Sequence, residues 1–559
     1  MKKTLLICLM GLLCLPISTL KAQSKVAESP PGTDLVYQPG IPGQEGGSSS
    51  ARRGEAAPVV IYGEFMGEIP EEEIFLYTWS RYSGNGLIYK DAIIQQIDLD
   101  MPSLQRGAVP GLVRTFNSST PSHLAPFYIC IRTEDKVLLS TALVLPGDSL
   151  MIRWESSEQL IYFSGPQGRQ MDLQHALYRL SQNTFTPNQT IVVNDRDEYL
   201  SSGKNLQKIE EARGLFGRQL DVVQRGSGEL ELLESKVMDT LYRSQIERLL
   251  ASYTGDISTE RIQLLRTEFL GRYDARLSKS LYRLVKGQKE LLIETASAAR
   301  LKHMLGRLKQ RMENIYLPLS YQLGGYLENW FYLSEASASI MDQDFFEWII
   351  SLDDGDGKDV LYEYYLLTHG KQLQDLDGRV ATALEEINDP IIWRNVEMIR
   401  KNRSSGVLIS SDPLISITGE NVGLDDFKEE LVLVEFWIPG CGACHYYYQN
   451  IMKELHLHFD GDPRIRLVSV GVDKEEGRWK ENEGEYYHGG GDNFFLKTYD
   501  HAVLKQLGIQ SFPSFALLDQ DSRILKASGF PTSDLQAWVD LLNTTLNKEF
   551  KPQSKISDL

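Results

Sequence analysis

The sequence predicts a multidomain protein with an all-β, sandwich-like N-terminal domain, an α-helical middle region and a C-terminal α/β region. Two observations predict this fold class. The chain has 559 residues, which is more than one hydrophobic core usually serves. Its apolar residues alternate in the first part, recur at three- and four-residue spacing in the middle, and return to short apolar runs between helical stretches near the end.

The overall composition limits the class of partner. Apolar residues make up 42% of the chain and charged residues 24%, as in an ordinary soluble globular protein. The formal net charge is −18. Sequence-independent binding of nucleic acids needs clustered Lys and Arg, so we expect no nucleic-acid partner.

The first 22 residues are typical of a secretory signal peptide. Lys2 and Lys3 precede an apolar stretch from Leu5 to Leu20, and cleavage is expected near Ala22. This stretch is short for a membrane span, and no later one is apolar enough, so we expect no transmembrane span in the mature chain. Residues 23–57, rich in Gly, Pro, Ser and Gln, are predicted to be a flexible linker. The expected location is the periplasm or cell envelope.

Residues 58–165 are predicted to form the β-sandwich-like domain. Alternating or continuous apolar segments there are separated by turn residues such as Pro146-Gly147, which favours a small antiparallel sandwich or barrel. Cys130 lies in one such segment and is interpreted as a buried packing cysteine. Helical periodicity then dominates residues 166–405, most clearly over 230–250, 262–285 and 291–312.

Residues 406–548 are predicted to alternate strand and helix around a central sheet, followed by a tail over 549–559. The sequence predicts strands at 432–437 and 464–472, a helix from Cys441 to about His458, a short helix at 502–507, a hairpin of 514–519 with 523–527, and a final helix capped by Ser533.

Two cysteines three positions apart follow the first of these strands. A Pro439-Gly440 turn leads to Cys441-Gly-Ala-Cys444, with Cys441 expected in the first turn of a helix, where free N–H groups stabilise a thiolate. Cys444 lies one turn further along the same face, so it can attack a mixed disulfide on Cys441. The spacing therefore predicts a dithiol redox centre, with Cys441 as the attacking and Cys444 as the resolving thiol.

Glu435 lies inside the apolar strand before this motif. A buried carboxylate is unfavourable unless it has a purpose, and burial raises its pKa, which suits a base that takes the Cys444 proton. The alternative is that the strand lies at an edge and Glu435 faces solvent.

The segment Gly508-Ile-Gln-Ser-Phe-Pro513, with Phe436-Trp437 and Gly529, makes this region resemble the thioredoxin superfamily. The nearest subgroup looks like the TlpA-type extracytoplasmic thiol:disulfide oxidoreductases, with an insertion over 473–498. The resemblance covers about the last quarter of the chain and implies a thioredoxin-like fold there. It also implies a cis Pro513 and a substrate surface made by Pro513, Phe512, Ser511 and Trp437.

The motif departs from the family at two positions. Gly440 replaces a common tryptophan and Ala443 the usual proline, which leaves the redox potential open. Other interpretations of the two cysteines are a zinc half-site, a structural disulfide and, because His445 follows Cys444, a haem-attachment motif. His445 could instead favour the Cys441 thiolate.

The function predicted from the sequence is an exported thiol:disulfide oxidoreductase without cofactor or metal. Its expected partners are disulfide-containing envelope proteins and a membrane thiol electron donor. The alternative is an envelope binding protein in which Cys441 and Cys444 are structural or vestigial.

Overall fold

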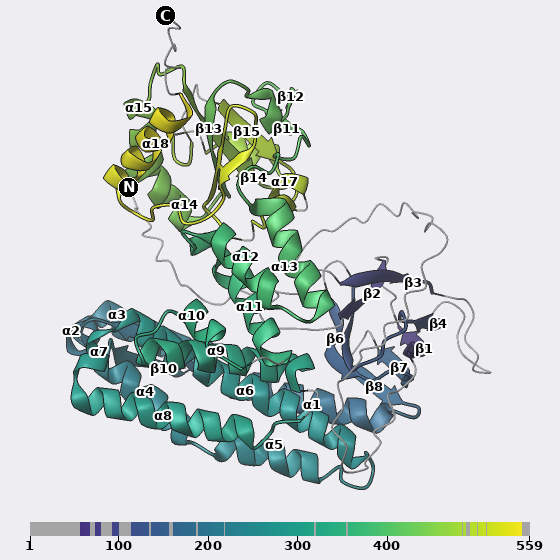
Figure 1. Cartoon of the computed structure of the whole chain (residues 1–559). Coiled ribbons are helices and arrows are strands. Elements are labelled where there is room, and N and C mark those ends of the chain that lie inside the picture. Colours follow the sequence, from purple (N-terminus) through teal and green to yellow (C-terminus); the bar gives the residue numbers. More distant parts are fainter. Residues whose placement is uncertain are drawn as a thin grey trace, which may run out of the picture. The chain divides into compact units, whose positions relative to one another are not determined.

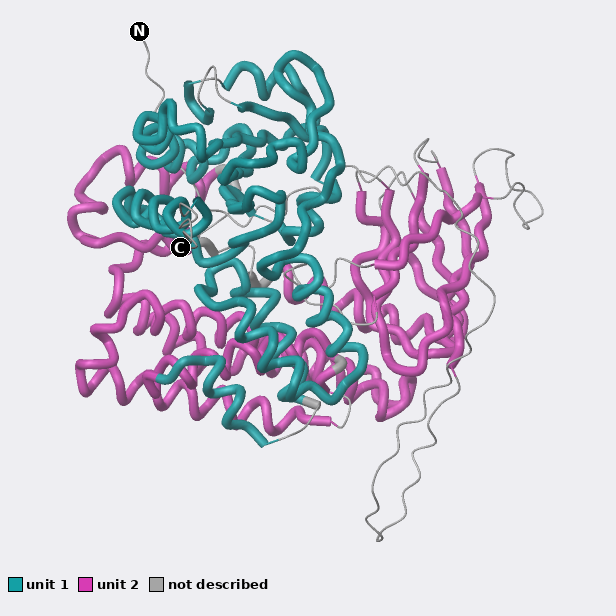
Figure 2. The backbone as a smooth tube through the Cα atoms, turned by 45° about the horizontal axis from the view of Figure 1, so that its top comes forward, with its two compact units in different colours: residues 1–13, 343–559 teal, residues 14–342 magenta. Residues whose placement is uncertain are grey.

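The computed structural model describes residues 56–67, 73–79, 92–99, 113–133, 136–155, 160–185, 188–216, 219–317, 320–353, 356–482, 484–487, 492–499, 501–509 and 511–550. The predicted export signal, nearly all of the linker and most of the tail lie outside these residues. The described chain forms two compact units, one ending at Asp342 and one starting at Gln343 (Figure 2). The second unit thus includes helices that the sequence prediction assigned to the middle region.

The first unit begins with two four-stranded sheets, ordered β4-β1-β7-β8 and β3-β2-β5-β6 (Figure 1). The strands are β1 (Val60–Met66), β2 (Ile74–Trp79), β3 (Ile93–Ile97), β4 (Val113–Ser119), β5 (Phe127–Arg132), β6 (Val137–Val144), β7 (Ser149–Glu155) and β8 (Leu160–Ser164). Alternating apolar residues such as Ile61, Leu76 and Ile129 bury the faces between them. The expectation of purely antiparallel pairing is wrong at β1 and β7, which run parallel. Five strands separate these two in sequence, and such long connections permit parallel pairing.

The rest of the first unit is mainly helical. Its elements are α1 (Gly168–Phe185), β9 (Asn188–Val193), α2 (Arg196–Ser201), α3 (Gly203–Phe216), β10 (Gln219–Gln224), α4 (Ser227–Met238), α5 (Leu241–Ala251), α6 (Thr259–Gly287), α7 (Glu290–Ile293), α8 (Thr295–Glu313), η1 (Ser320–Gln322) and α9 (Gly324–Ile340). The parallel pair of β9 and β10 was not predicted. Helices α6 and α9 cross closely, because a Cβ on Gly271 would lie 2.6 Å from the backbone of Gly325.

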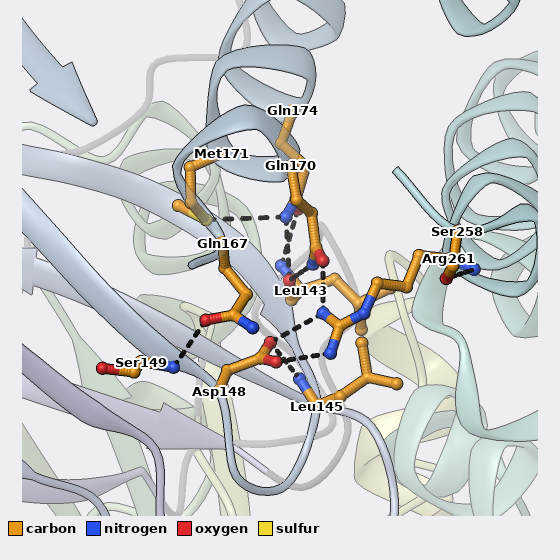
Figure 3. A network of polar contacts seen from close by, with 10 residues as sticks. All are labelled: Leu143, Leu145, Asp148, Ser149, Gln167, Gln170, Met171, Gln174, Ser258 and Arg261. Carbon is orange, nitrogen blue, oxygen red and sulfur yellow. Dashed lines mark hydrogen bonds and ion pairs between the residues drawn. The ribbon is translucent and has the colours of Figure 1, made fainter. Parts of the chain in front are cut away.

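A buried polar network joins the sheets of this unit to its helices (Figure 3). Asp148, in the turn between β6 and β7, is ion-paired with Arg261 of α6 at 2.6 Å. The side chain of Gln174 on α1 both accepts from the Leu143 backbone N–H and donates to the Leu143 carbonyl, each at 2.8 Å. The network satisfies the polar groups of a sheet edge that the helices bury.

The second unit begins with helices α10–α13 and continues into a seven-stranded sheet, ordered β12-β11-β15-β14-β13-β16-β17, with further helices between its strands. Its first elements are α10 (Phe345–Ile350), α11 (Asp356–His369), η2 (Gly370–Gln372), α12 (Leu376–Glu386) and α13 (Pro390–Arg403). The sheet region consists of β11 (Leu414–Ser416), β12 (Asn421–Val422), η3 (Leu424–Asp426), β13 (Leu431–Trp437), α14 (Gly442–Tyr447), η4 (Tyr448–Met452), α15 (Lys453–His458), β14 (Ile465–Val472), α16 (Glu476–Lys480), β15 (Asp492–Leu496), α17 (Ala502–Gln506), β16 (Ser514–Leu518), β17 (Ile524–Lys526) and α18 (Leu535–Glu549).

Every strand and helix predicted for this region is present, but β11, β12, β15 and α16 were not predicted. The helix after Cys441 ends at His458 as expected, but η4 within it is a π-helical turn. Strand β15 lies inside the predicted insertion and pairs with β14. The final helix is capped by Asp534, whose side chain accepts from the Ala537 N–H, and not by Ser533. No helix in the described parts of the chain is long and apolar enough to cross a membrane.

Candidate functional site

Cys441 and Cys444 lie where β13 passes into α14. The connecting turn needs Gly440, whose φ of 77° is in the left-handed region that other residues rarely adopt. Cys441 is the N-cap of α14, one position earlier than predicted, and its Sγ accepts from the Cys444 N–H at 3.1 Å. The two residues form a disulfide with Cα atoms 5.3 Å apart. Cys441 is half-buried whereas Cys444 is only 1% exposed, so an incoming group can reach only the first sulfur.

Glu435 lies in the middle of the sheet, because β13 pairs with β14 on one side and β16 on the other. It is 1% exposed, so the alternative of a solvent-facing edge position is wrong. It follows Leu431 and Leu433 at two-residue spacing, and these pack against Tyr448 and other residues of the helical segment that follows Cys441. Glu435 thus points to the face that this segment covers.

The carboxyl group of Glu435 has no compensating partner at one of its oxygens. Among the described residues, Oε1 has no hydrogen bond and no ion pair reaches the side chain. Burial alone raises the pKa of Glu435 to about 8. The group therefore loses its proton at a much higher pH than an ordinary glutamate does.

The loop before β16 faces the disulfide. Its Phe512-Pro513 peptide bond is cis, which confirms the conformation that the resemblance implied. The Phe512 carbonyl oxygen lies 3.8 Å from Cys441 Sγ. Ser511 is exposed, and Phe512 and Pro513 are half-buried. The structure thus brings three of the four predicted substrate-contacting residues to the side of Cys441.

Trp437, the fourth predicted substrate contact, is fully buried. Its Nε1–H donates to Ser469 Oγ at 2.9 Å, and its ring stacks on Tyr486 and Tyr487. The residues after β14 cover it, which a strand pattern alone does not reveal. A direct contact between Trp437 and a substrate does not fit this burial.

The segment between β14 and β15 also holds the helix that carries Cys444. Trp479, Tyr486 and Tyr487 form one apolar cluster with Trp437 and Cys444. His445 Nδ1 lies 3.0 Å from the Glu485 carbonyl, and the Gln449 amide donates to the Gly484 carbonyl at 3.0 Å. The segment between β14 and β15 thus anchors this helix.

The exposed surface beside Cys441 combines aromatic and basic side chains. Tyr499 is about half exposed, and its ring centre lies 6.2 Å from that of Phe512. Arg478 approaches the turn, since its Nη2 would lie 3.7 Å from a Cβ on Gly440. An extended peptide with a disulfide could lie along such a surface.

No protein-family model and no curated protein matches the chain. The solved structures that resemble it over about a quarter of its length include thiol-disulfide oxidoreductases. One is the thioredoxin domain of a thiol-disulfide oxidoreductase from Bacteroides vulgatus, at 28% identity over 25% of this chain and 97% of that chain, with a TM-score of 0.22. Another is a thiol:disulfide interchange protein from Bacteroides sp., at 26% identity over 28% of this chain and 95% of that chain, with a TM-score of 0.23.

Dithiol chemistry is what these residues can perform. The site offers one accessible sulfur, a second enclosed sulfur, a buried acid and an open carbonyl edge. Within the described ranges, no three His, Cys, Asp or Glu side chains converge as metal ligands would. Sequence reasoning missed one neighbour of the proline loop, Lys371, because it lies 140 residues away from Ser511 along the chain.

Proposed function

We propose that this protein is an exported thiol:disulfide oxidoreductase of the TlpA type. The observation that carries the proposal is an accessible Cys441 and an enclosed Cys444 at the start of a helical segment that covers the face to which Glu435 points. Among the described residues, Glu435 is buried there without an ion pair. A disulfide that serves only as a staple needs no uncompensated acid nearby, and burial of such an acid is unfavourable.

In the reducing direction the pair begins as two thiols. The Cys441 thiolate attacks one sulfur of a substrate disulfide, the substrate S–S bond breaks, and the other substrate sulfur leaves as a thiolate. The N-cap position supports the Cys441 thiolate, because the Cys444 N–H points at its sulfur. The product of this step is a mixed disulfide between Cys441 and the substrate.

The enclosed thiol completes the exchange. Cys444 gives its proton to the Glu435 carboxylate and attacks Cys441 Sγ, which releases the second substrate sulfur as a thiolate. Two electrons pass to the substrate, and the protein becomes the disulfide seen here. A carboxyl group with a pKa of about 8 is closely matched to a thiol, so the proton moves between them with a small change in free energy.

The proposed setting is the cell envelope. Residues 1–22 have the pattern of a secretory signal, and dithiol exchange outside the cytoplasm acts on the disulfides of exported proteins. A membrane thiol donor would restore the two thiols after each turnover. In this role Ser511, Phe512 and Pro513 hold the substrate backbone.

The test uses the mature chain and its Cys441→Ala and Cys444→Ala variants. We expect reversible titration of one dithiol in a glutathione buffer, catalysis of insulin reduction by dithiothreitol, and loss of that catalysis in both variants. Cys444→Ala should accumulate mixed disulfides with envelope proteins, whereas Cys441→Ala should not. If the wild-type pair does not titrate, the disulfide is structural, and the alternative of an envelope binding protein is supported. A haem absorption band in the purified protein would support the haem-attachment alternative.

A further inference from the structure

Helices α11–α13, which precede the region that resembles the thioredoxin superfamily, contact the proline loop directly. The contact is made by η2, the short turn after α11. Lys371 on this turn places its Nζ 3.0 Å from Ser514 Oγ and 3.3 Å from both Ser511 Oγ and the Ser511 carbonyl. An ammonium group has three donors, so it can bond to all three of these oxygens.

The two serines flank the Phe512-Pro513 peptide. Ser514 Oγ donates to the Ser511 carbonyl at 2.6 Å, which closes the loop across its base. Lys371 bonds to both ends of this link, so its charge strengthens the bridge between the residues on either side of Pro513. The Phe512 carbonyl, 3.8 Å from Cys441 Sγ, lies on the segment held in this way.

The backbone around Lys371 is itself fixed to the sheet region. The Gly529 N–H donates to the Lys371 carbonyl at 2.8 Å, and Ser528 Oγ donates to the Leu373 carbonyl at 2.9 Å. Gly529 has no room for a side chain, because a Cβ there would lie 2.6 Å from the Leu373 carbonyl oxygen. The lysine therefore extends from a fixed base.

A second cation from the same helices supports the start of the loop. Arg403, the last residue of α13, lies against Gly508, and a Cβ on Gly508 would overlap its guanidinium group. Burial lowers the pKa of Arg403 to about 10. The loop over 508–514 thus contacts these helices at both of its ends.

We propose that Lys371 is a positioning residue for thiol–disulfide exchange, which holds the proline loop in the conformation that binds a peptide next to Cys441. The inference rests on the proposed function. It also gives the helices before the sheet a role, since they complete the substrate-binding edge. Lys371 does not touch the reacting sulfurs, so its effect should depend on how much a substrate relies on the loop.

The decisive experiment compares two disulfide substrates with Lys371→Met, which keeps most of the stem and removes the ammonium group. Insulin presents peptide backbone on both sides of its disulfides, whereas hydroxyethyl disulfide has none. We expect kcat/KM for insulin to fall about three- to tenfold, mainly through KM, and the rate with hydroxyethyl disulfide to change less than twofold. The matched control is Lys526→Met, because Lys526 donates to Gln374 in the same segment, at 3.4 Å, and lies over the Phe530 ring, and it makes no hydrogen bond to the described residues of the loop.

A second variant tests the same bridge independently, in case Lys371→Met disturbs folding. Ser514→Ala removes the bridge from the other side, and the double variant with Lys371→Met should be less impaired than the product of the two single effects. Equal insulin rates for Lys371→Met and wild type would overturn the inference. So would parallel losses with both substrates or strictly multiplicative effects. Each of these leaves the proposed function intact, which fails instead if wild type itself reduces neither substrate.

Discussion

The two units of the molecule both bury acidic side chains, but only one of the two acids compared below has ion-pair partners among the described residues. In the first unit, Asp274 on α6 is 0% exposed and lies between two arginines. Arg243 pairs with one of its oxygens, and Arg311 lies 3.4 Å from the other. In the second unit, Glu435 is buried to almost the same degree without an ion pair among the described residues.

The causes of the pKa shifts express the same contrast. Burial raises the pKa of Asp274, and Arg243 and Arg311 both oppose that rise. Burial raises the pKa of Glu435 to about 8 with no opposing charge. A charge that only supports the fold is neutralised by partners, whereas an acid that must exchange protons is left without them. If Glu435 carries the proton in the proposed reaction, the acid without a partner, and not burial alone, distinguishes the site.

The largest expected effect is the loss of the partnered acid. Asp274→Asn leaves Arg243 and Arg311 without their counterion in a buried position, so we expect the first unit to lose about 3–5 kcal/mol of unfolding free energy. Urea unfolding and hydrogen exchange along α6 measure this loss. The titration of the cysteine pair should not change.

The matched control for Asp274→Asn is Asp462→Asn. Asp462 pairs with Arg464 at the surface, at 2.7 Å, so its replacement should change stability by less than about 1 kcal/mol. A similarly small loss for Asp274→Asn would remove the distinction between the two kinds of buried acid.

The next effect has the opposite sign. Below about pH 4.5, Glu435 is protonated in both the folded and the unfolded protein. Between about pH 4.5 and 8 it ionises only in the unfolded chain, and above about pH 8 it ionises in both. Wild-type stability should therefore fall across this window and level off above it. Glu435→Gln cannot ionise, so we expect it to be about 3 kcal/mol more stable than wild type at pH 7 and to show no such slope.

The same Glu435→Gln variant should slow the resolving step roughly tenfold or more, because Cys444 loses its proton acceptor. Urea midpoints across the pH range and rapid-quench kinetics of the mixed disulfide measure the two effects. Glu430→Gln, at the rim of the sheet beside Arg466, is the control and should leave the slope in place. A Glu435→Gln protein with unchanged slope and unchanged resolution would mean that Glu435 is not the proton carrier.

The smallest effect concerns the cysteines of the two units. Cys130 on β5 is a free thiol, 6% exposed, and burial raises its pKa to about 12, so it holds almost no thiolate at neutral pH. Cys130→Ala should keep full insulin-reducing activity and lose about 1 kcal/mol of stability. In the reduced native protein, iodoacetamide should label Cys441 far faster than Cys130, as read by mass spectrometry. A more than twofold loss of activity would instead make Cys130 a partner of the reactive pair.

Much of the reactive region could be predicted because its signals are local. A continuous apolar run predicted the strand before Cys441, and a Pro-Gly pair predicted the turn that follows it. The polar residues from Asp519 to Ser522 predicted the hairpin turn between β16 and β17. The burial of Glu435 followed from the apolar residues on both sides of it. These features need only the period and chemistry of neighbouring residues.

The features that were missed depend on which segments meet in space. The parallel pairing of β1 with β7 and of β9 with β10 joins strands whose own patterns say nothing about direction. Trp437 was predicted to contact a substrate, but its ring stacks on Tyr486 and is buried. Lys371 carried no signal at all, since a lysine after a helix is ordinarily a solvated charge.

The glycine at position 529 has a consequence for how this protein can be divided and inherited. Its tight contact with the Leu373 carbonyl means that position 529 in the sheet region must stay small to fit against the segment that follows α11. A fragment starting at residue 406 would lack the Leu373 carbonyl that Gly529 contacts. It would also lack Lys371, so the side of the proline loop that Lys371 contacts would be exposed. A fusion point between Gln343 and residue 406 would therefore separate the sheet region from groups that it packs against.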